Sequence, residues 1–288
     1  MFHRIKIWDI AFIIALPLIA ACGNSSSDTA PTVYAVEYLP STGMNAPTQG
    51  KTVFELKITK QSDGSPATGL NPSVTLTMHM TNGHTHATPV DSITESGTAG
   101  VYDCTVYYLM ASGPAMGTWE MNVMVDGETT TFYPDVAMAM GSDNVYSTLY
   151  GADDIVTTMS GTAYNKYYIF RDGMASASMG TLNLYISHSE NMMMDFTAVS
   201  DGLVLSAPTG TITSMIVSAS TDSAFASGVA TGIDDAHGHW SLSGLTNLVS
   251  AQTTTVYVKL NVNGQDKTTN GAAASGGNAY ATFVVTPQ

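Results

Sequence analysis

The chain of 288 residues is acidic, with 23 aspartates and glutamates against 9 lysines and arginines, and only 11% of its residues are charged. A net charge of −14 excludes nucleic-acid binding through phosphate contacts and favours the attraction of cations. Besides Cys22 the chain has one thiol, Cys104, so no internal disulfide is expected. Because Cys104 lies in an alternating segment, we expect a small buried residue rather than a nucleophile.

The first thirty residues have the pattern of a lipoprotein export signal. A positively charged start precedes an apolar run over residues 10–21, which is too short to span a membrane comfortably, and small residues lead to Cys22. This predicts a signal peptide over residues 1–21, cleavage before Cys22 and lipidation of that cysteine. The alternatives are an ordinary signal peptide and an N-terminal membrane helix. Residues 22–31 are then the lipidated cysteine and a polar tether, and the protein is expected in the cell envelope, facing the periplasm or the cell surface.

From residue 32 onward almost every periodic segment has a period of two, which is typical of strands. Gly, Pro, Asn and Asp separate these segments, and none of them shows a helical stripe. The expected strands are Val53–Ile58, Val74–Met80, Val101–Leu109, Trp119–Val125, Tyr167–Phe170, Leu182–His188, Met194–Val199, Ile212–Ala219, Trp240–Leu242, Val256–Val262 and Tyr280–Val285. Strands at this spacing predict an all-β protein made of two tandem immunoglobulin-like antiparallel β-sandwiches.

The two predicted sandwiches are of similar size. Turn-rich residues 141–154 are the expected linker between a first sandwich over residues 32–140 and a second over residues 155–288. Each half has a Gly-x-Trp sequence at the start of a strand, at Gly117–Trp119 and at Gly238–Trp240. The second half is therefore either a diverged repeat of the first or an unrelated sandwich whose core also uses a tryptophan.

Three histidines lie close together around the end of one expected strand. Alternation along that strand places Met78 and Met80 on the face opposite His79. An Asn-Gly dipeptide follows Met80 and predicts a two-residue hairpin turn, in which His79 pairs with His86 and both project from the same side as His84. Three imidazoles on one hairpin suit Cu(II) or Zn(II). A looser loop that brings Met78 or Met80 beside His84 gives the thioether and imidazole set that favours Cu(I) instead.

A second group of histidines lies in the other half of the chain. His188 ends an expected strand and is followed by Glu190, and His237 and His239 flank the glycine of the second Gly-x-Trp sequence. If the halves are repeats, these segments lie at the same end of the second sandwich and form a second metal site. The alternative is a set of solvated loop histidines.

Residues from about 50 to 126 include the segments LTMHMTNGHTHATP and GTAGVYDCTVYYLMASGPAMGTWEMNVMVDG. Their Met- and His-bearing strand end, Gly-x-Tyr strand and Gly-x-Trp strand resemble the YtkA-like/FixH-like small β-sandwich domain. The matching residues are Met78, Met80, His84, Pro89, Gly100, Tyr102, Gly117 and Trp119. That family is similar to copper-handling, CopC-like immunoglobulin-like domains, so the resemblance implies this fold and copper binding. His79 between the two methionines and the additional His86 depart from the family pattern.

Motifs of the common enzyme classes are absent from the sequence. It has no Cys-x-x-Cys-His haem motif, P-loop, dinucleotide fingerprint or Gly-x-Ser-x-Gly elbow, so an enzyme is not expected. The sequence predicts an extracytoplasmic protein, held to the membrane by lipid on Cys22, that binds copper and stores it or passes it to a copper-accepting envelope protein. The alternative is a cell-surface structural or adhesion module without a metal.

Overall fold

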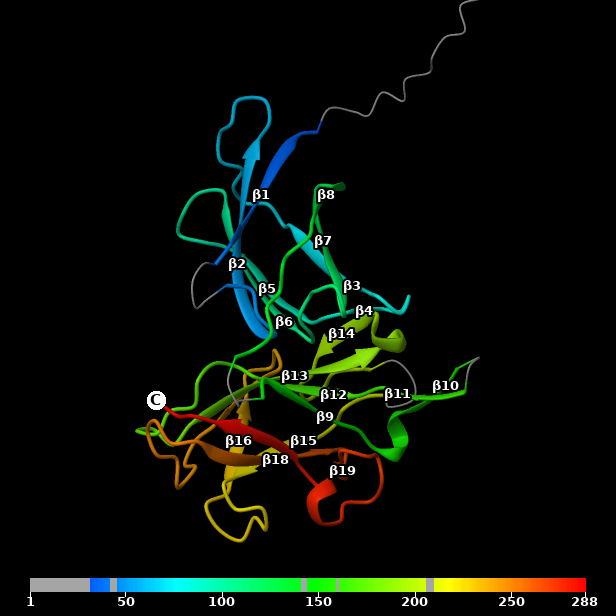
Figure 1. Ribbon diagram of the computed structural model, residues 1–288, viewed down its shortest axis with the longest axis vertical. Helices are drawn as coiled ribbons and strands as arrows, with labels where there is room; N and C mark the ends of the chain where they lie inside the picture. Colours follow the sequence, from blue (N-terminus) through cyan, green and yellow to red (C-terminus); the bar gives the residue numbers. More distant parts are fainter. Residues whose placement is uncertain (1–31, 42–45, 141–143, 159–160, 206–209) are drawn as a thin grey trace, which may run out of the picture. The chain divides into compact units, whose positions relative to one another are not determined.

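The computed structural model describes residues 32–41, 46–140, 144–158, 161–205 and 210–288 (Figure 1). The predicted signal peptide, Cys22 with the predicted tether up to residue 31, and residues 141–143 of the predicted linker lie outside the described residues. Residues Val33–Gln288 form one compact unit. Within the described ranges, no helix has the length and apolar character needed to cross a membrane.

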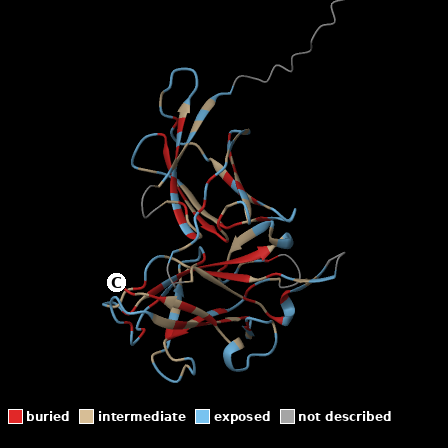
Figure 2. Cartoon of the chain, in the orientation of Figure 1, coloured by how far each residue is buried: buried red, intermediate tan, exposed pale blue. Residues whose placement is uncertain are grey.

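The first part of this unit is a sandwich of two four-stranded sheets, with the strand orders β1-β2-β6-β5 and β4-β3-β7-β8. Its strands are β1 (Tyr34–Pro40), β2 (Gly50–Lys60), β3 (Ser73–Met80), β4 (Thr85–Ala87), β5 (Val90–Glu95), β6 (Val101–Tyr108), β7 (Gly117–Val125) and β8 (Glu128–Phe132). Alternate residues of β2 and β7 are buried, as the period of two requires (Figure 2). Phe54 and Leu56 of one sheet and Met78 and Trp119 of the other meet in a common core.

The second part is built around a ten-stranded sheet that follows the path β19-β18-β15-β16-β17-β13-β12-β9, with β14 beside β13 and β20 beside β18. Its elements are β9 (Tyr146–Leu149), η2 (Ala152–Asp154), β10 (Ile155–Thr158), β11 (Gly161–Tyr164), β12 (Tyr167–Arg171), β13 (Leu182–Glu190), η3 (Asn191–Met193), β14 (Asp195–Ala198), β15 (Met215–Ser220), β16 (Ala230–Asp234), β17 (His239–Leu242), β18 (Thr254–Val262), β19 (Gln265–Lys267), η4 (Gly276–Asn278) and β20 (Ala281–Val285). The hairpin of β10 and β11 forms a separate two-stranded sheet.

Strand β16 connects the two halves of the long sheet. Ala230 and Thr231 pair with β15, whereas Gly232, Ile233 and Asp234 pair with β17. Buried residues from both halves, including Leu184, Trp240, Val217 and Val258, belong to one core. The sheet therefore folds over onto itself and encloses this core, so one continuous sheet supplies both layers of the second sandwich.

An aromatic cluster joins the first sandwich to the second. Tyr107 of β6 stacks on Tyr185 of β13, with the ring centroids 4.2 Å apart and the planes 2° from parallel. Leu109, Tyr168 and Phe170 complete this buried cluster. Stacked and tilted aromatic rings each contribute about 0.5–1.5 kcal/mol beyond the burial of their area.

The prediction of an all-β protein with antiparallel sheets is confirmed. The immunoglobulin-like topology, the domain boundaries and the relationship between the two halves stay predictions. Both Gly-x-Trp glycines have a positive φ, 138° at Gly117 and 87° at Gly238, and both face a carbonyl oxygen of a neighbouring strand. Each glycine lets the chain approach that strand closely, and each following tryptophan enters the core beside it.

We expect Gly117→Ala to lower the free energy of unfolding by about 1–3 kcal/mol more than Gly127→Ala does. Both glycines have a positive φ, so both variants suffer the conformational strain of a left-handed residue. Of these two glycines, only Gly117 has backbone in the way of an added Cβ, which would collide with the carbonyl oxygen of His79. A Cβ added at Gly127 has no atom within 4 Å. Urea unfolding followed by tryptophan fluorescence measures both values, and equal losses would contradict the close approach of β7 to β3.

Candidate metal site

The hairpin of β3 and β4 contains the first group of histidines. Its turn has three residues, Thr81 to Gly83, and is closed by the Met80 amide, which donates to the His84 carbonyl at 2.9 Å. The Gly83 amide donates to the Met80 carbonyl at 3.0 Å, and the His84 amide donates to Asn82 Oδ1 at 3.1 Å. Gly83 adopts the positive φ of 84° that this turn requires.

The predicted pairing of His79 with His86 is wrong. His79 pairs with Thr85, and His86 pairs with Met78. A three-residue turn shifts the register by one residue relative to the predicted two-residue turn, and a shift of one residue sends a side chain to the opposite face of the sheet. His79 therefore lies on the outer face, His84 is exposed in the turn, and only His86 enters the interior.

The imidazole of His86 is buried, with 7% of its surface exposed. Its Nδ1 lies 2.8 Å from the Ala87 carbonyl oxygen, and its Nε2 lies 3.2 Å from Met110 Sδ. Burial lowers the pKa of His86, and the hydrogen bond to Ala87 only partly opposes this. A carbonyl oxygen accepts but cannot donate, so Nδ1 carries the proton of the neutral ring and Nε2 presents its lone pair to the sulfur.

Two further methionines share the inner face with His86. Met78 is its direct neighbour across the β3–β4 pair and is fully buried, and Met80 lies two residues further along the same face. The edge of the Trp119 ring meets His86, with the ring centroids 5.4 Å apart. Trp119 Nε1 also donates to the Met110 carbonyl at 3.0 Å, which fixes the position of the Met110 backbone.

A segment with three methionines, Met192 to Met194, lies against the outside of the β3–β4 hairpin. Thr85 Oγ1 donates to Met194 Sδ at 3.8 Å, and η3 contacts β4. Asn191, Met192 and Met193 have φ values of 46°, 56° and 68°, a run of left-handed residues that carries strain. Tyr168 donates to Met193 Sδ at 3.4 Å and helps to hold the segment in place.

The outer-face histidine is engaged in a surface ion pair. His79 Nε2 lies 3.3 Å from Glu120 Oε2 on the neighbouring strand β7, and half of the His79 side chain is exposed. Pairs of this kind contribute about 0–1 kcal/mol. His79, His84 and His86 thus lie on the outer face, in the turn and in the interior, and the structure does not bring them together.

The second group of histidines is also separated. His188 is fully buried in β13, its ring lies 4.8 Å from that of Tyr167, and burial lowers its pKa to about 4. His188 Nδ1 lies 3.6 Å from Glu190 Oε1, beyond the usual hydrogen-bond distance. His237 is exposed in the loop before β17. Of the three residues of the predicted second site, His188 therefore lies in the core, His237 in a loop and His239 in a network of carboxylates.

His239 lies between two acidic side chains. Its Nδ1 is 2.8 Å from Asp172 Oδ2 and its Nε2 is 3.1 Å from Asp91 Oδ1. These hydrogen bonds, to Asp172 first and Asp91 second, raise the pKa of His239 to about 10, so both ring nitrogens are protonated donors. Asp172 also accepts from Lys51 at 2.5 Å and from Tyr107 at 2.9 Å. Burial opposes the ionisation of Asp172, but the hydrogen bonds from His239 and Lys51 outweigh it and lower its pKa.

A grouping of three or more His, Cys, Asp or Glu side chains suited to a metal ion does not occur in the part of the chain that the structure describes. Such groupings do not include methionine sulfur. The candidate metal-binding arrangement is therefore the pair of His86 and Met110. Cys104 is fully buried, which confirms the expectation for it, and burial raises the pKa of its thiol to about 12. A buried thiol that stays protonated is a poor nucleophile at neutral pH.

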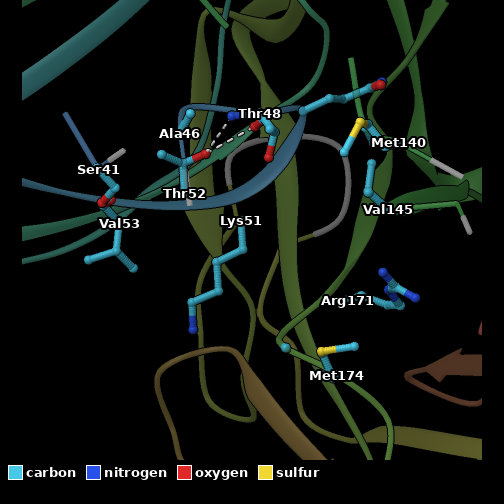
Figure 3. Close-up of a pocket in the computed structure, with 13 residues that line it drawn as sticks. Ser41, Ala46, Thr48, Lys51, Thr52, Val53, Met140, Val145, Arg171 and Met174 are labelled. Carbon is cyan, nitrogen blue, oxygen red and sulfur yellow. Dashed lines mark hydrogen bonds between the residues drawn. The ribbon is translucent and has the colours of Figure 1, made fainter. Parts of the chain in front are cut away.

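A cavity of about 560 Å³ lies away from these histidines (Figure 3). Its lining includes Thr48 and Lys51 from one side of the cavity and Met140, Val145 and Arg171 from the other. None of the predicted ligands lines it. We therefore assign it no part in metal binding.

Sequence comparison does not identify the chain. Models of known protein families and curated proteins both give no match. The resemblance of residues 50–126 to YtkA-like/FixH-like domains therefore stays a prediction.

Met110 is the site residue that sequence reasoning missed. It follows the last residues of β6, and its contact with His86 depends on how the end of β6 meets β4. The sequence signal was limited to a methionine shortly before a Gly-x-Trp strand, and methionines there are more often core residues than ligands. Only the packing of the two sheets brings the sulfur and the imidazole together.

The His239 network predicts that stability falls as the solution becomes alkaline. Because folding raises the pKa of His239 from 6.5 to about 10, its contribution is complete below pH 6.5 and is lost as the pH rises toward 10. We expect His239→Gln to remove about 0.5–1 kcal/mol of this pH-dependent stability, given the partial exposure of the ring. Thermal unfolding measured between pH 6.5 and about pH 10 tests this expected loss of stability. The matched control is His237→Gln, two residues away in an exposed position, and identical pH profiles for the two variants would contradict the network.

Proposed function

We propose that the protein binds Cu(I) outside the cytoplasm, with His86 and Met110 as its central ligands. The observation that carries this is the 3.2 Å separation of His86 Nε2 and Met110 Sδ. In the neutral ring Nε2 carries no proton. The nitrogen and the sulfur therefore each have a lone pair available for a metal ion. A metal–nitrogen bond of about 2.0 Å and a metal–sulfur bond of about 2.3 Å fit two donors at this separation.

The chemistry of the surroundings favours the monovalent ion. Thioether sulfur is a soft ligand that selects Cu(I), and Met78 and Met80 supply two more sulfurs on the inner face beside His86. Among the described residues, His86 and Met110 form their polar contacts with each other, with the Ala87 carbonyl and with Trp119, whereas carboxylates would suit harder ions. The lowered pKa of His86 keeps the imidazole neutral and ready to bind a metal at neutral pH.

We further propose that Cys22 carries a lipid that holds the protein in the cell envelope, facing the periplasm or the cell surface. The acidic surface of the chain, with a net charge of −14, raises the local concentration of cations near the site. A site of soft ligands suits storage of copper or its transfer to an envelope protein. The rival function is a structural or adhesion module of the cell surface, which needs no metal.

Titration of Cu(I) against a competing chelator tests the ligand assignment. We expect Met110→Leu to weaken Cu(I) binding by at least about tenfold, which corresponds to about 1.4 kcal/mol, because it removes one sulfur at nearly constant volume. His86→Phe should have the same effect or a larger one. The matched control is His79→Ala, which changes a histidine of the same strand pair on the outer face and should leave the affinity unchanged.

Two outcomes would overturn this assignment. One is the absence of Cu(I) binding stronger than that of the chelator, which would favour the structural module. The other is a loss of affinity in His79→Ala with none in Met110→Leu, which would move the site to the outer face. Quenching of tryptophan emission on Cu(I) addition gives an independent readout, because Trp119 lies against His86.

The lipid anchor is tested by cell fractionation. We expect Cys22→Ser to move the chain from the membrane fraction to the soluble fraction, because the residue that receives the lipid is absent. Cys104→Ala is the matched control, since Cys104 is a buried thiol of the core and should not affect membrane retention. Membrane retention of the Cys22→Ser chain would show that a different segment holds it.

A further inference from the structure

Lys267, the last residue of β19, is fully buried. Its Nζ lies 2.6 Å from Asp153 Oδ1, 3.0 Å from Asp154 Oδ2 and 3.0 Å from Gln265 Oε1. The amine also lies 5.3 Å from the centre of the Tyr167 ring. Lysine is almost never fully buried unless it is paired, so this amine has a specific role in the second sandwich.

The two carboxylates around Lys267 have different environments. Asp154 is fully buried, and the Gly151 amide donates to its Oδ2 at 2.6 Å. Burial raises the pKa of Asp154, and the nearby Lys267 only partly opposes this. The Asp153 side chain is 41% exposed and reaches solvent. One carboxyl is thus held dry against the amine, and the other connects the amine to water.

We propose that Lys267 and Asp154 form an intramolecular isopeptide bond, between Nζ of the lysine and Cγ of the aspartate. Three features of the site favour this reaction over a permanent ion pair. The two groups are already in contact, they are held away from solvent, and a low dielectric favours the neutral amine and carboxylic acid over the charged pair. Holding two reacting groups in contact and in the right orientation raises the rate of their reaction by several orders of magnitude.

The reaction balances without any co-reactant. One proton passes from the ammonium of Lys267 to the carboxylate of Asp154, which leaves a neutral amine and a neutral acid. The amine lone pair attacks Cγ to form a tetrahedral intermediate. A second proton leaves the nitrogen and joins the departing hydroxyl group, so one water is released and one amide bond remains. No charge, oxidant or reductant enters or leaves.

Two neighbours assist these steps. The Gly151 amide, which donates to Asp154 Oδ2, stabilises negative charge on that oxygen in the tetrahedral intermediate. Asp153, 2.6 Å from Nζ, accepts the second proton and returns it to the leaving hydroxyl group. Its exposed side chain also lies on a route by which the released water reaches solvent.

The position of the bond in the sheet explains what it does. Strands β19 and β9 are the two ends of the path through the long sheet. They meet at Tyr150 and Thr268, whose amides and carbonyls exchange hydrogen bonds of 2.9 Å and 2.8 Å. Lys267 and Asp154 lie beside this bridge. The isopeptide bond therefore closes the sheet covalently at the place where its two ends meet.

Peptide mapping of the full-length chain tests the proposal. Chymotrypsin cuts after tyrosine and leucine, so residues 151–164 and 261–280 are released as separate peptides in an unmodified chain. We expect one branched peptide with their combined mass less one water, and fragmentation should place the bond at Asp154 and Lys267. Recovery of the two peptides only as unlinked species would overturn the proposal, and so would a link at Asp153.

Matched variants identify the groups that react. Lys267→Met and Asp154→Ala should abolish the branched peptide, whereas Lys259→Met, which removes a lysine of the neighbouring strand β18, should retain it. Asp153→Asn should slow bond formation after refolding by about tenfold or more if Asp153 carries the proton. The map of the unaltered chain decides the proposal even if a variant fails to fold. None of these results depends on copper binding.

Discussion

The alternation of side chains along a strand is the constraint on which the core and the candidate metal site both depend. Each sheet of the first sandwich contributes one face to the core, so the pairing register decides which residues are buried. In the β3–β4 hairpin the register is set by the hydrogen bond from Met80 to His84, which closes a three-residue turn. That bond directs His86 inward, beside Met78, and leaves His79 in solvent. The chemistry of the site thus follows from the length of one turn.

Buried charge is the second organising element, and it is used sparingly. The chain has few cations, and three of its basic side chains are each placed against carboxylates: Lys51 and His239 at Asp172, and Lys267 at Asp153 and Asp154. An unpaired buried charge costs several kcal/mol, so each pairing fixes the segments that supply it. The Asp172 network, together with the stack of Tyr107 on Tyr185, ties β6 to the strands of the second sandwich. Electrostatics and aromatic packing act at the same junction.

The class of fold was predictable, because strands such as β2, β7 and β18 alternate over their whole length. The sequence did not predict β1, β4, β5, β8, β9, β10, β11, β16 and β19, since strands of three to seven residues carry little periodicity. At the site, the sequence identified His86, Met78 and Met80 but not their arrangement. The Asn-Gly dipeptide favoured a shorter turn than the one that forms, and an error of one residue reverses a face. Met110 and Lys267 acquire their neighbours only through contacts between distant segments, 24 and 114 residues apart in the chain, which no local pattern encodes.

The closure of the long sheet at Tyr150 and Thr268 has a consequence for the order of folding. All strands of the first sandwich lie before residue 133, so that sandwich can form while the rest of the chain is still being synthesised. The second sandwich cannot close until Thr268 reaches Tyr150, and residues 254–258 of β18 lack a partner on one side until β20 has arrived. Non-local pairing of this kind is slow because the loop must close before its contacts form. During that interval the unpaired edge of β18 is the segment most exposed to association with another chain, so the last strand of the protein also protects it from aggregation.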